Sequence, residues 1–142
     1  MTQLAQVSME TEMMETSKNT FLHLSVQAAT FSKWDSFFKI RDLYESYVNP
    51  KTLKAILFKR SIIEGSYSKT EKYIFKSDGK TISSTSKTNN KPETKKTFTV
   101  GTSTQDIVSI IYKLRTIDFQ NYKNGQTKSF VIVFDEKEVP VL

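Results

Sequence analysis

Few side chains of this 142-residue sequence have the chemistry that catalysis or metal binding requires. The sequence contains no cysteine and a single histidine, His23. Disulfides, thiolate metal sites, thiol catalysis and multi-histidine sites are therefore excluded. His23 falls on the more polar face of an alternating segment and has no recognisable partner motif. We therefore expect a half-exposed surface histidine and not a catalytic one.

Carboxylates are the remaining candidates for general acid–base chemistry. Asp42 lies close to Glu45 in the sequence, and Glu64 could meet Asp106 in the fold. Neither a phosphate-binding glycine loop nor a nucleophile elbow accompanies these residues. Ion pairing is the simpler interpretation, and three arginines are available for it: Arg41, Arg60 and Arg115. We therefore expect a protein that is not an enzyme, with no catalytic residues, no metal site and no cofactor.

The basic composition favours anionic partners only weakly. The formal net charge is +6, and a basic surface can serve nucleic acid or anionic lipid. The lysines are scattered, however, with local bunching only between residues 87 and 96. Solvated lysines of loops and strand edges are the simpler interpretation, so no nucleic-acid partner is expected. The sequence also contains no apolar run long enough to span a membrane.

Residues 31–40 form the most aromatic stretch of the sequence. Four aromatic residues are interleaved with lysines there: Phe31, Trp34, Phe37 and Phe38. Such a pattern can stack nucleic-acid bases, but the sequence holds no second cluster of this kind. We expect instead a corner that packs into the core, with Ser32 capping a short helical turn.

One stretch alone has strong helical periodicity, and the remaining elements must be arranged around it. Four apolar side chains share one face at the i, i+3, i+4 and i+7 spacing: Ile107, Ile110, Ile111 and Leu114. Either of two pairs can form a capping box at its start: Thr102 with Gln105, or Ser103 with Asp106. We therefore predict an α-helix at about residues 103–116, with a role in packing.

Most of the other residues are typical of strands and turns. Alternating apolar and polar residues predict strands over 5–14 and 20–29. Two turns, at 49–52 and at Glu64-Gly65, predict a three-stranded meander: one strand before the first turn, one between the two turns and one after the second. Further strands are predicted over residues 81–86, 94–100, 129–134 and 138–142. The predicted fold class is mainly β (α+β): a curved, half-barrel-like antiparallel sheet wrapped on one α-helix, in a single domain over residues 1–142.

The predicted pairing of the meander places apolar side chains on both faces of the sheet. In this register Val48 pairs with Leu53, and the second turn pairs Ile63 with Ser66. One face then packs on the helix, and the other presents aromatic side chains that can line a cleft for an apolar ligand. These candidate ligand-binding residues are Tyr47, Phe58, Tyr67, Tyr73 and Phe75. The alternative is that they form a second core layer or pack on further strands.

Four segments, in this order, resemble an uncharacterised bacterial family. They are residues 37–53, 63–67, 104–109 and 111–118. In this combination the sequence is similar to the family called domain of unknown function 3108, especially to its Bacteroidetes members, over about residues 5–142. The resemblance implies a curved antiparallel sheet around a helix, loosely like the half-barrel carriers of bacterial lipoproteins. Because family members usually have further strands at both ends, we expect this sequence to lack N-terminal and C-terminal strands of the family.

The resemblance also implies an exported protein, although the first residues of this sequence do not have the pattern of a signal peptide. We therefore expect a location in the periplasm or at the outer-membrane periphery of a Gram-negative bacterium. The first functional hypothesis is a cell-envelope protein that binds an apolar ligand or lipid in a concave sheet. The alternative is an envelope assembly module that pairs with a partner protein through open sheet edges. In either case we expect a monomer or a weak dimer.

Overall fold

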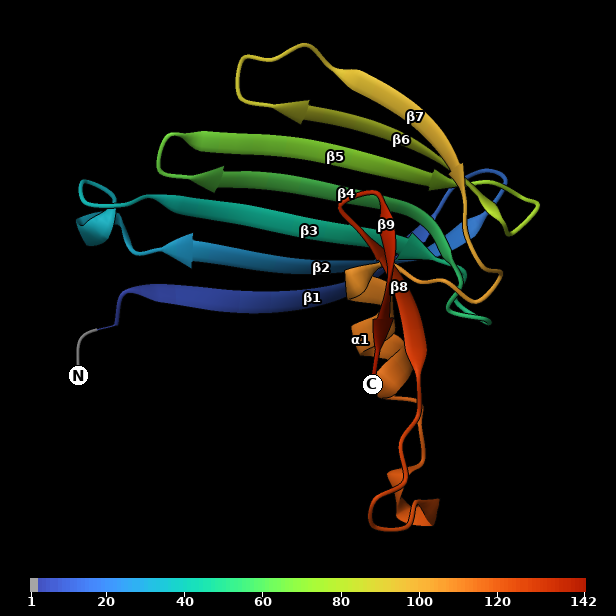
Figure 1. Ribbon diagram of the computed structural model, residues 1–142. Coiled ribbons are helices and arrows are strands. Elements are labelled where there is room, and N and C mark those ends of the chain that lie inside the picture. The colour runs from blue at the N-terminus through green and yellow to red at the C-terminus, as the bar shows by residue number, and fades with distance from the viewer. Residues whose placement is uncertain (1–2) are drawn as a thin grey trace.

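A seven-stranded antiparallel sheet dominates the computed structural model, which describes residues 3–142 (Figure 1). Each strand pairs with its neighbours in the chain, so the spatial order runs from β1 to β7 and the sheet keeps two open edges. The strands are β1 (Ala5–Glu15), β2 (Thr20–Thr30), β3 (Ile40–Val48), β4 (Ala55–Glu64), β5 (Tyr67–Phe75), β6 (Thr81–Thr88) and β7 (Thr94–Thr99). The predicted mainly β class and the curved sheet that does not close into a barrel are confirmed.

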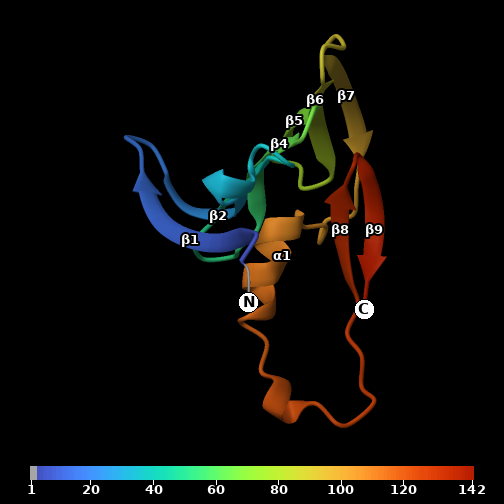
Figure 2. The ribbon, with the colours of Figure 1, turned by 90° about the vertical axis from the view of Figure 1, so that its left-hand side faces the viewer.

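The rest of the chain lies on the concave side of this sheet (Figures 1 and 2). It comprises α1 (Ile107–Leu114) and a hairpin of β8 (Phe130–Phe134) and β9 (Lys137–Val141). Two short 3-10 helices, Ser32–Trp34 and Phe119–Asn121, lie in loops. Within residues 3–142 no helix is long and apolar enough to cross a membrane.

The pairing of β3 with β4 differs from the predicted register. Val48 pairs with Ala55 and not with Leu53, and Tyr44 faces Arg60. At Val48 the slip is two positions, but a register shift between Tyr47 and Val48 makes it three from Tyr47 inward. Because three is odd, the side chains of β4 from Leu57 onward lie on the opposite face from the one predicted relative to β3. The second turn is also displaced, to Gly65-Ser66 between Glu64 and Tyr67, but by an even slip that keeps the faces of β4 and β5 in step.

The β3–β4 loop explains the two-position part of the slip, because it is longer than the four-residue turn that was predicted. The side chain of Asn49 accepts hydrogen bonds from the backbone of Lys51 at 2.8 Å and of Thr52 at 3.1 Å. Asparagine side chains often stabilise turns in this way. Leu53 then adopts a left-handed conformation, with φ of 56°, and its N–H donates to the Asn49 carbonyl at 2.8 Å. These local bonds delay the start of β4 to Ala55.

The helix is confirmed, but it begins later than predicted and with a different cap. Asp106 is the N-cap residue, and its carboxylate accepts from the backbone N–H groups of Val108 and Ser109. Ser109 completes the capping box by accepting from the Asp106 N–H at 3.1 Å. Both predicted capping boxes were therefore wrong. The preceding residue, Gln105, instead pairs with β8: its N–H donates to Val131 O, and its carbonyl accepts from Val133 N.

The core lies between the concave face of the sheet and the elements that cover it. Its buried apolar side chains come from both layers: Leu24, Val48, Phe58, Tyr73, Ile82, Val100, Val108 and Val133. The prediction that α1 covers the face opposite to Phe58 and Tyr73 was wrong, because both aromatic residues lie on the side of the helix. The physical reason is the odd slip between β3 and β4, which the sequence pattern does not reveal.

Candidate functional site

The five aromatic residues predicted to bind a ligand do not lie on one face. Phe58, Tyr67, Tyr73 and Phe75 share the concave face, whereas Tyr47 points to the convex face. Phe58 and Tyr73 are almost completely buried, at 1% and 0% exposure, and their rings lie 5.5 Å apart in the core. Tyr67 is 41% exposed, toward the β4–β5 turn. The structure therefore brings Phe58 and Tyr73 together as core residues and separates Tyr47 from them.

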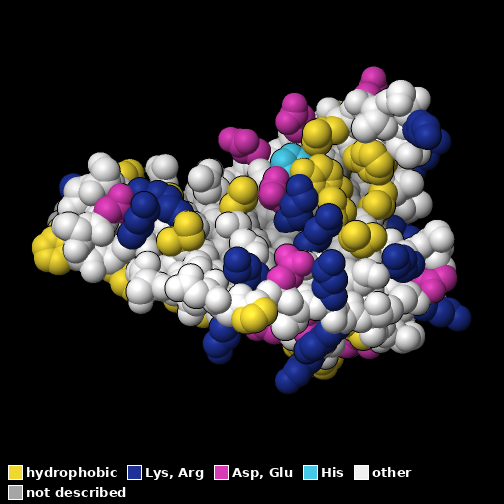
Figure 3. All heavy atoms as spheres, turned by 90° about the horizontal axis from the view of Figure 1, so that it is seen from above, with side chains coloured by type: hydrophobic (Ala, Val, Ile, Leu, Met, Phe, Trp, Pro, Cys, Tyr) yellow, Lys and Arg dark blue, Asp and Glu magenta, His cyan; other side chains and the backbone are white. Residues whose placement is uncertain are grey.

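Tyr47 belongs to a shallow apolar groove on the convex face. The ring of His23 stacks on Tyr47 at 4.6 Å, and the Lys59 ammonium lies 5.3 Å from the Tyr47 ring centroid. His23 also forms a 3.0 Å hydrogen bond with Glu45, so the histidine is half-buried against two partners. Figure 3 shows the single histidine beside a patch of hydrophobic side chains bordered by basic ones. The groove has a volume of about 340 Å³ and is lined by Met14, Thr16, Phe21, Tyr47, Leu57 and Lys59.

A second apolar pocket lies on the concave side, between α1, the sheet and β8. Its volume is about 220 Å³, and its lining residues are Val26, Tyr44, Ile107, Val108, Ile111 and Phe134. The only polar side-chain atom in this lining is the Tyr44 hydroxyl, and burial raises the pKa of Tyr44. The prediction included the helical positions Ile107 and Ile111 as packing residues, but Val26, Tyr44 and Phe134 were missed. The alternation of β2 could have indicated Val26, whereas Tyr44 and Phe134 meet only through the tertiary fold.

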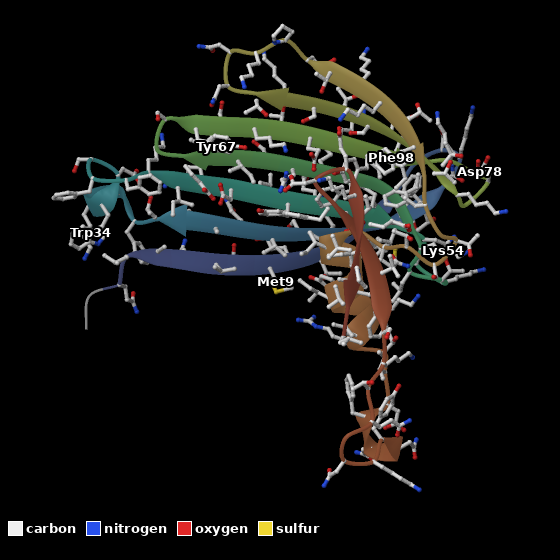
Figure 4. All side chains as sticks on the ribbon, viewed as in Figure 1. Met9, Trp34, Lys54, Tyr67, Asp78 and Phe98 are labelled. Carbon is white, nitrogen blue, oxygen red and sulfur yellow. The ribbon has the colours of Figure 1, made fainter. Side chains whose placement is uncertain are left out.

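The pocket opens onto the concave face of the edge strand β1. Val7, Met9 and Met13 lie on this face, and Met9 pairs with Val26 of the pocket (Figure 4). Their exposures of 68%, 40% and 55% make β1 the open apolar flank of the pocket. The hydroxyl of Tyr112 holds α1 against this strand, since it accepts from Thr11 Oγ1 at 2.8 Å. The apolar surface therefore continues from the pocket to Met9 and Val7, whereas the Thr11–Tyr112 contact separates Met13 from them.

A cluster of charged side chains forms the other wall of the concave face. Arg60 Nη2 lies 2.5 Å from Asp135 Oδ1 and 3.3 Å from Glu71 Oε1, and the guanidinium carbon lies 4.6 Å from the centroid of the Phe134 ring. Lys69 Nζ reaches Asp135 at 3.1 Å and Glu71 at 3.4 Å. The two cations and two carboxylates thus compensate one another next to the apolar pocket.

This charged cluster is incompletely hydrogen-bonded. Arg60 Nε and both carboxylate oxygens of Glu71 are buried and have no hydrogen-bond partner among the described residues. Buried polar atoms of folded proteins are usually satisfied, so the ionic contacts of Glu71 with Arg60 and Lys69 have to compensate for the missing hydrogen bonds. The charged wall therefore closes this side of the core.

Asp42 of β3 and Glu64 of β4 are two further carboxylates on the concave face. Asp42 is 7% exposed and accepts a hydrogen bond from the Ile63 N–H at 3.2 Å. Burial, and then a hydrogen bond with Glu64, raises the pKa of Asp42 to about 6. Glu45 points to the opposite face, so the predicted pairing of Asp42 with Glu45 does not form.

The other predicted pairing of carboxylates, Glu64 with Asp106, does not form either, because the Asp106 carboxylate is buried and accepts from Ser46 Oγ at 2.6 Å. Arg41 and Arg115 do not pair with these carboxylates as expected. Arg41 pairs with Asp35 at 2.6 Å, and the guanidinium of Arg115 lies over the ring of Tyr112. Within residues 3–142 no group of three or more histidine or carboxylate side chains could hold a metal ion.

The comparisons with known proteins gave one match. A family model described as "Protein of unknown function (DUF3108)" matches residues 1–142, which is the whole chain. No curated protein and no solved structure matches the chain.

Proposed function

The chain belongs to the DUF3108 family of proteins of unknown function, and we propose that it is a non-enzymatic cell-envelope protein that binds an apolar ligand or lipid on the concave face of its sheet. The observation that carries this proposal is the pocket between α1, β2, β3 and β8, whose lining is apolar apart from one tyrosine hydroxyl. Apolar pockets with few polar groups are the usual form of small-molecule sites.

The dimensions of the pocket favour a long, flexible ligand. A volume of about 220 Å³ is smaller than the roughly 300–1,000 Å³ of typical ligand sites, so it accommodates one end of a larger molecule. Met9 and Val7 continue the apolar surface along β1. Methionine side chains adapt to ligands of irregular shape. An acyl chain that enters beside α1 and lies along β1 fits this arrangement.

The charged residues beside the pocket limit which polar head group such a ligand can have. Arg60 and Lys69 are already paired with Glu71 and Asp135, so a free carboxylate would find no unpaired cation there. We therefore favour a ligand with an uncharged polar head.

Two matched lysine substitutions test the proposal. Ile111 lines the pocket and is 38% exposed, whereas Ile74 is 39% exposed on the convex face, so both tolerate a charged side chain to a similar degree. We expect Ile111→Lys to weaken the binding of a dansyl-labelled fatty alcohol by about tenfold or more, because the ammonium would enter an apolar pocket. Ile74→Lys should bind as tightly as the unchanged protein. Equal losses in both variants, or no saturable binding at all, would contradict the proposal.

The free edge of β1 supports a second candidate, an assembly module that pairs with a partner strand. β1 is eleven residues long, and every one of its residues is exposed. Exposed edge strands present unpaired backbone groups that can accept another strand. This candidate predicts that the partner slows hydrogen exchange of the β1 amides. A complex in which only α1 and β8 amides are protected would exclude it.

The location that we propose is the periplasm or the outer-membrane periphery of a Gram-negative bacterium. The support is the resemblance of residues 37–53, 63–67, 104–109 and 111–118 to exported members of the family. Fractionation of cells that express the native gene tests this proposal, and recovery of the protein in the cytoplasm alone would contradict it.

A further inference from the structure

The loop between β2 and β3, residues 31–39, forms an aromatic tip at one end of the sheet. Figure 4 shows Trp34 at this end, beyond the ends of the strands and away from α1. Phe37 is 80% exposed and Phe38 is 53% exposed. The prediction that this segment packs into the core as a corner was therefore wrong. Figure 3 shows hydrophobic side chains protruding at the same end of the molecule, with basic side chains behind them.

The tip is held rigidly by side chains at its base. The Asp35 carboxylate accepts from Thr30 Oγ1 at 2.6 Å and from Arg41 Nη2 at 2.6 Å. Hydrogen bonds from Thr30, and then from Arg41, lower the pKa of Asp35, so the carboxylate stays ionised and paired. Trp34 Nε1 donates to the Gln3 carbonyl at 3.0 Å, which ties the tip to the start of β1. The exposed rings are thus presented by an ordered structure.

The backbone of the tip already uses its hydrogen-bonding groups internally. The N–H groups of Phe37 and Phe38 both donate to the Trp34 carbonyl, at 2.9 and 3.1 Å, and Asp35 N–H donates to Ser32 O. Unpaired N–H groups are what makes irregular backbone costly in an apolar medium. This tip can therefore enter the boundary of a lipid layer without leaving those donors unsatisfied.

The charges around the tip are complementary to an anionic surface. Lys33 and Lys39 flank the exposed rings, and the Lys33 ammonium lies 5.6 Å from the Trp34 ring centroid. The one carboxylate of the segment, Asp35, is neutralised by Arg41, so the two lysines remain as the net charge of the tip. Aromatic rings at the interfacial level with lysines that reach phosphate groups are the pattern of interfacial membrane contacts.

We propose that this tip docks the protein on an anionic phospholipid bilayer, with Phe37 inserted among the lipids, the exposed side of Phe38 at the lipid boundary, and Lys33 and Lys39 against the phosphates. The site is distinct from the concave pocket and does not depend on that pocket taking a ligand. A bilayer fits better than a protein partner because the Phe37 ring projects from the tip, and neither phenyl ring lines the grooves described above. A fluid phase can enclose the Phe37 ring from all sides and can cover the exposed side of the Phe38 ring, whose other side lies against Gly65 of the β4–β5 turn.

The chain carries its own reporter for this contact, since Trp34 is the only tryptophan. The unchanged protein is titrated with phosphatidylcholine vesicles that do or do not contain phosphatidylglycerol. We expect the emission of Trp34 to shift to shorter wavelength, and to be quenched by bromine-labelled acyl chains, with the anionic vesicles. Neutral vesicles should give a much weaker response, because each lysine near an anionic surface contributes about fivefold in affinity.

Matched variants separate insertion of the tip from non-specific adsorption of the protein to vesicles. Phe37→Ser should reduce vesicle affinity by about tenfold or more, since a phenyl ring no longer leaves water. Phe119→Ser is the control, because Phe119 is also an exposed phenylalanine, at 60%, and lies in another loop. Lys33→Gln should lose about fivefold on anionic vesicles and nothing on neutral ones.

Four outcomes would overturn the proposal. The first is a folded protein whose tryptophan emission does not respond to anionic vesicles. The second is an equal loss of affinity in Phe119→Ser and Phe37→Ser. The third is equal binding to neutral and anionic vesicles. The fourth is a self-associated or partner-bound protein in which Trp34 is shielded before any lipid is added.

Discussion

Replacing Asp42 by asparagine should stabilise the protein at neutral pH, although it removes a charged group from a folded structure. The Asp42 carboxyl is 7% exposed, beside Glu64, and these surroundings raise its pKa from 3.8 to about 6. Each pKa unit between the folded and unfolded states corresponds to about 1.4 kcal/mol. Above pH 6 the ionised carboxylate therefore costs the folded state about 3 kcal/mol.

The sign of this effect follows from proton binding. Between pH 3.8 and about 6 the folded chain retains a proton on Asp42 that the unfolded chain has lost. The free energy of unfolding therefore falls as the pH rises through this window, and then stays level as far as this group is concerned. Asp42→Asn removes the slope and keeps an oxygen that can accept from the Ile63 N–H. Burial also raises the pKa of Asp106, but that contribution is common to both proteins.

Urea unfolding of both proteins at a series of pH values measures the difference. We expect similar stability near pH 4 and an advantage of about 2–3 kcal/mol for Asp42→Asn near pH 7, with unchanged m-values. Glu64→Gln should reduce the slope of the unchanged protein, because Glu64 is part of its cause. Parallel curves for Asp42→Asn and the unchanged protein across this range would refute the reasoning.

Three further substitutions test the packing around the two proposed sites. Asp106→Ala should lower the free energy of unfolding by about 3 kcal/mol, because it leaves the N–H groups of Val108 and Ser109 and the Ser46 hydroxyl unpaired in the core. A loss under 1 kcal/mol in urea unfolding would be inconsistent with that role. Gly65→Ala should cost about 1–2 kcal/mol and change the emission of the neighbouring tryptophan, because Gly65 has φ of 61° and its added methyl group would lie 2.7 Å from the ring of Phe38. An unchanged melting temperature would exclude this strain. Tyr112→Phe should cost about 1 kcal/mol and speed hydrogen exchange in β1, since the hydroxyl bonds Thr11; unchanged exchange would show that α1 does not hold this edge.

The elements of the fold could be predicted from sequence because their signals are local. The alternation in residues 5–14 and 20–29 matches β1 and β2, and the apolar stripe from Ile107 to Leu114 matches α1. The pairing register could not be predicted, because it depends on Asn49 bonds that lengthen one loop and on a register shift between Tyr47 and Val48. That register shift decides which face of the sheet carries Phe58, and with it which side chains line the concave pocket.

The residues of the aromatic tip could be recognised in the sequence, whereas those of the concave pocket could not. The aromatic and lysine-rich character of residues 31–40 is visible in the sequence, but apolar density there predicted burial. The pairing of Asp35 with Arg41 holds the loop outward and explains the exposure of Phe37. The concave pocket joins residues of β2 and β3 with Phe134 of β8, and no local pattern indicates contacts at that separation.

The order of the strands has a consequence for how the molecule folds. Every pairing in the seven-stranded sheet joins strands that are adjacent in the chain, and such short-range topologies fold fast. The concave pocket instead requires closure of long loops, as in the bond between Ser46 and Asp106 and the packing of Phe134 near Tyr44. The loop-closure entropy of folding is therefore concentrated in the docking of α1 and β8. A destabilised variant should lose that layer first and retain the meander.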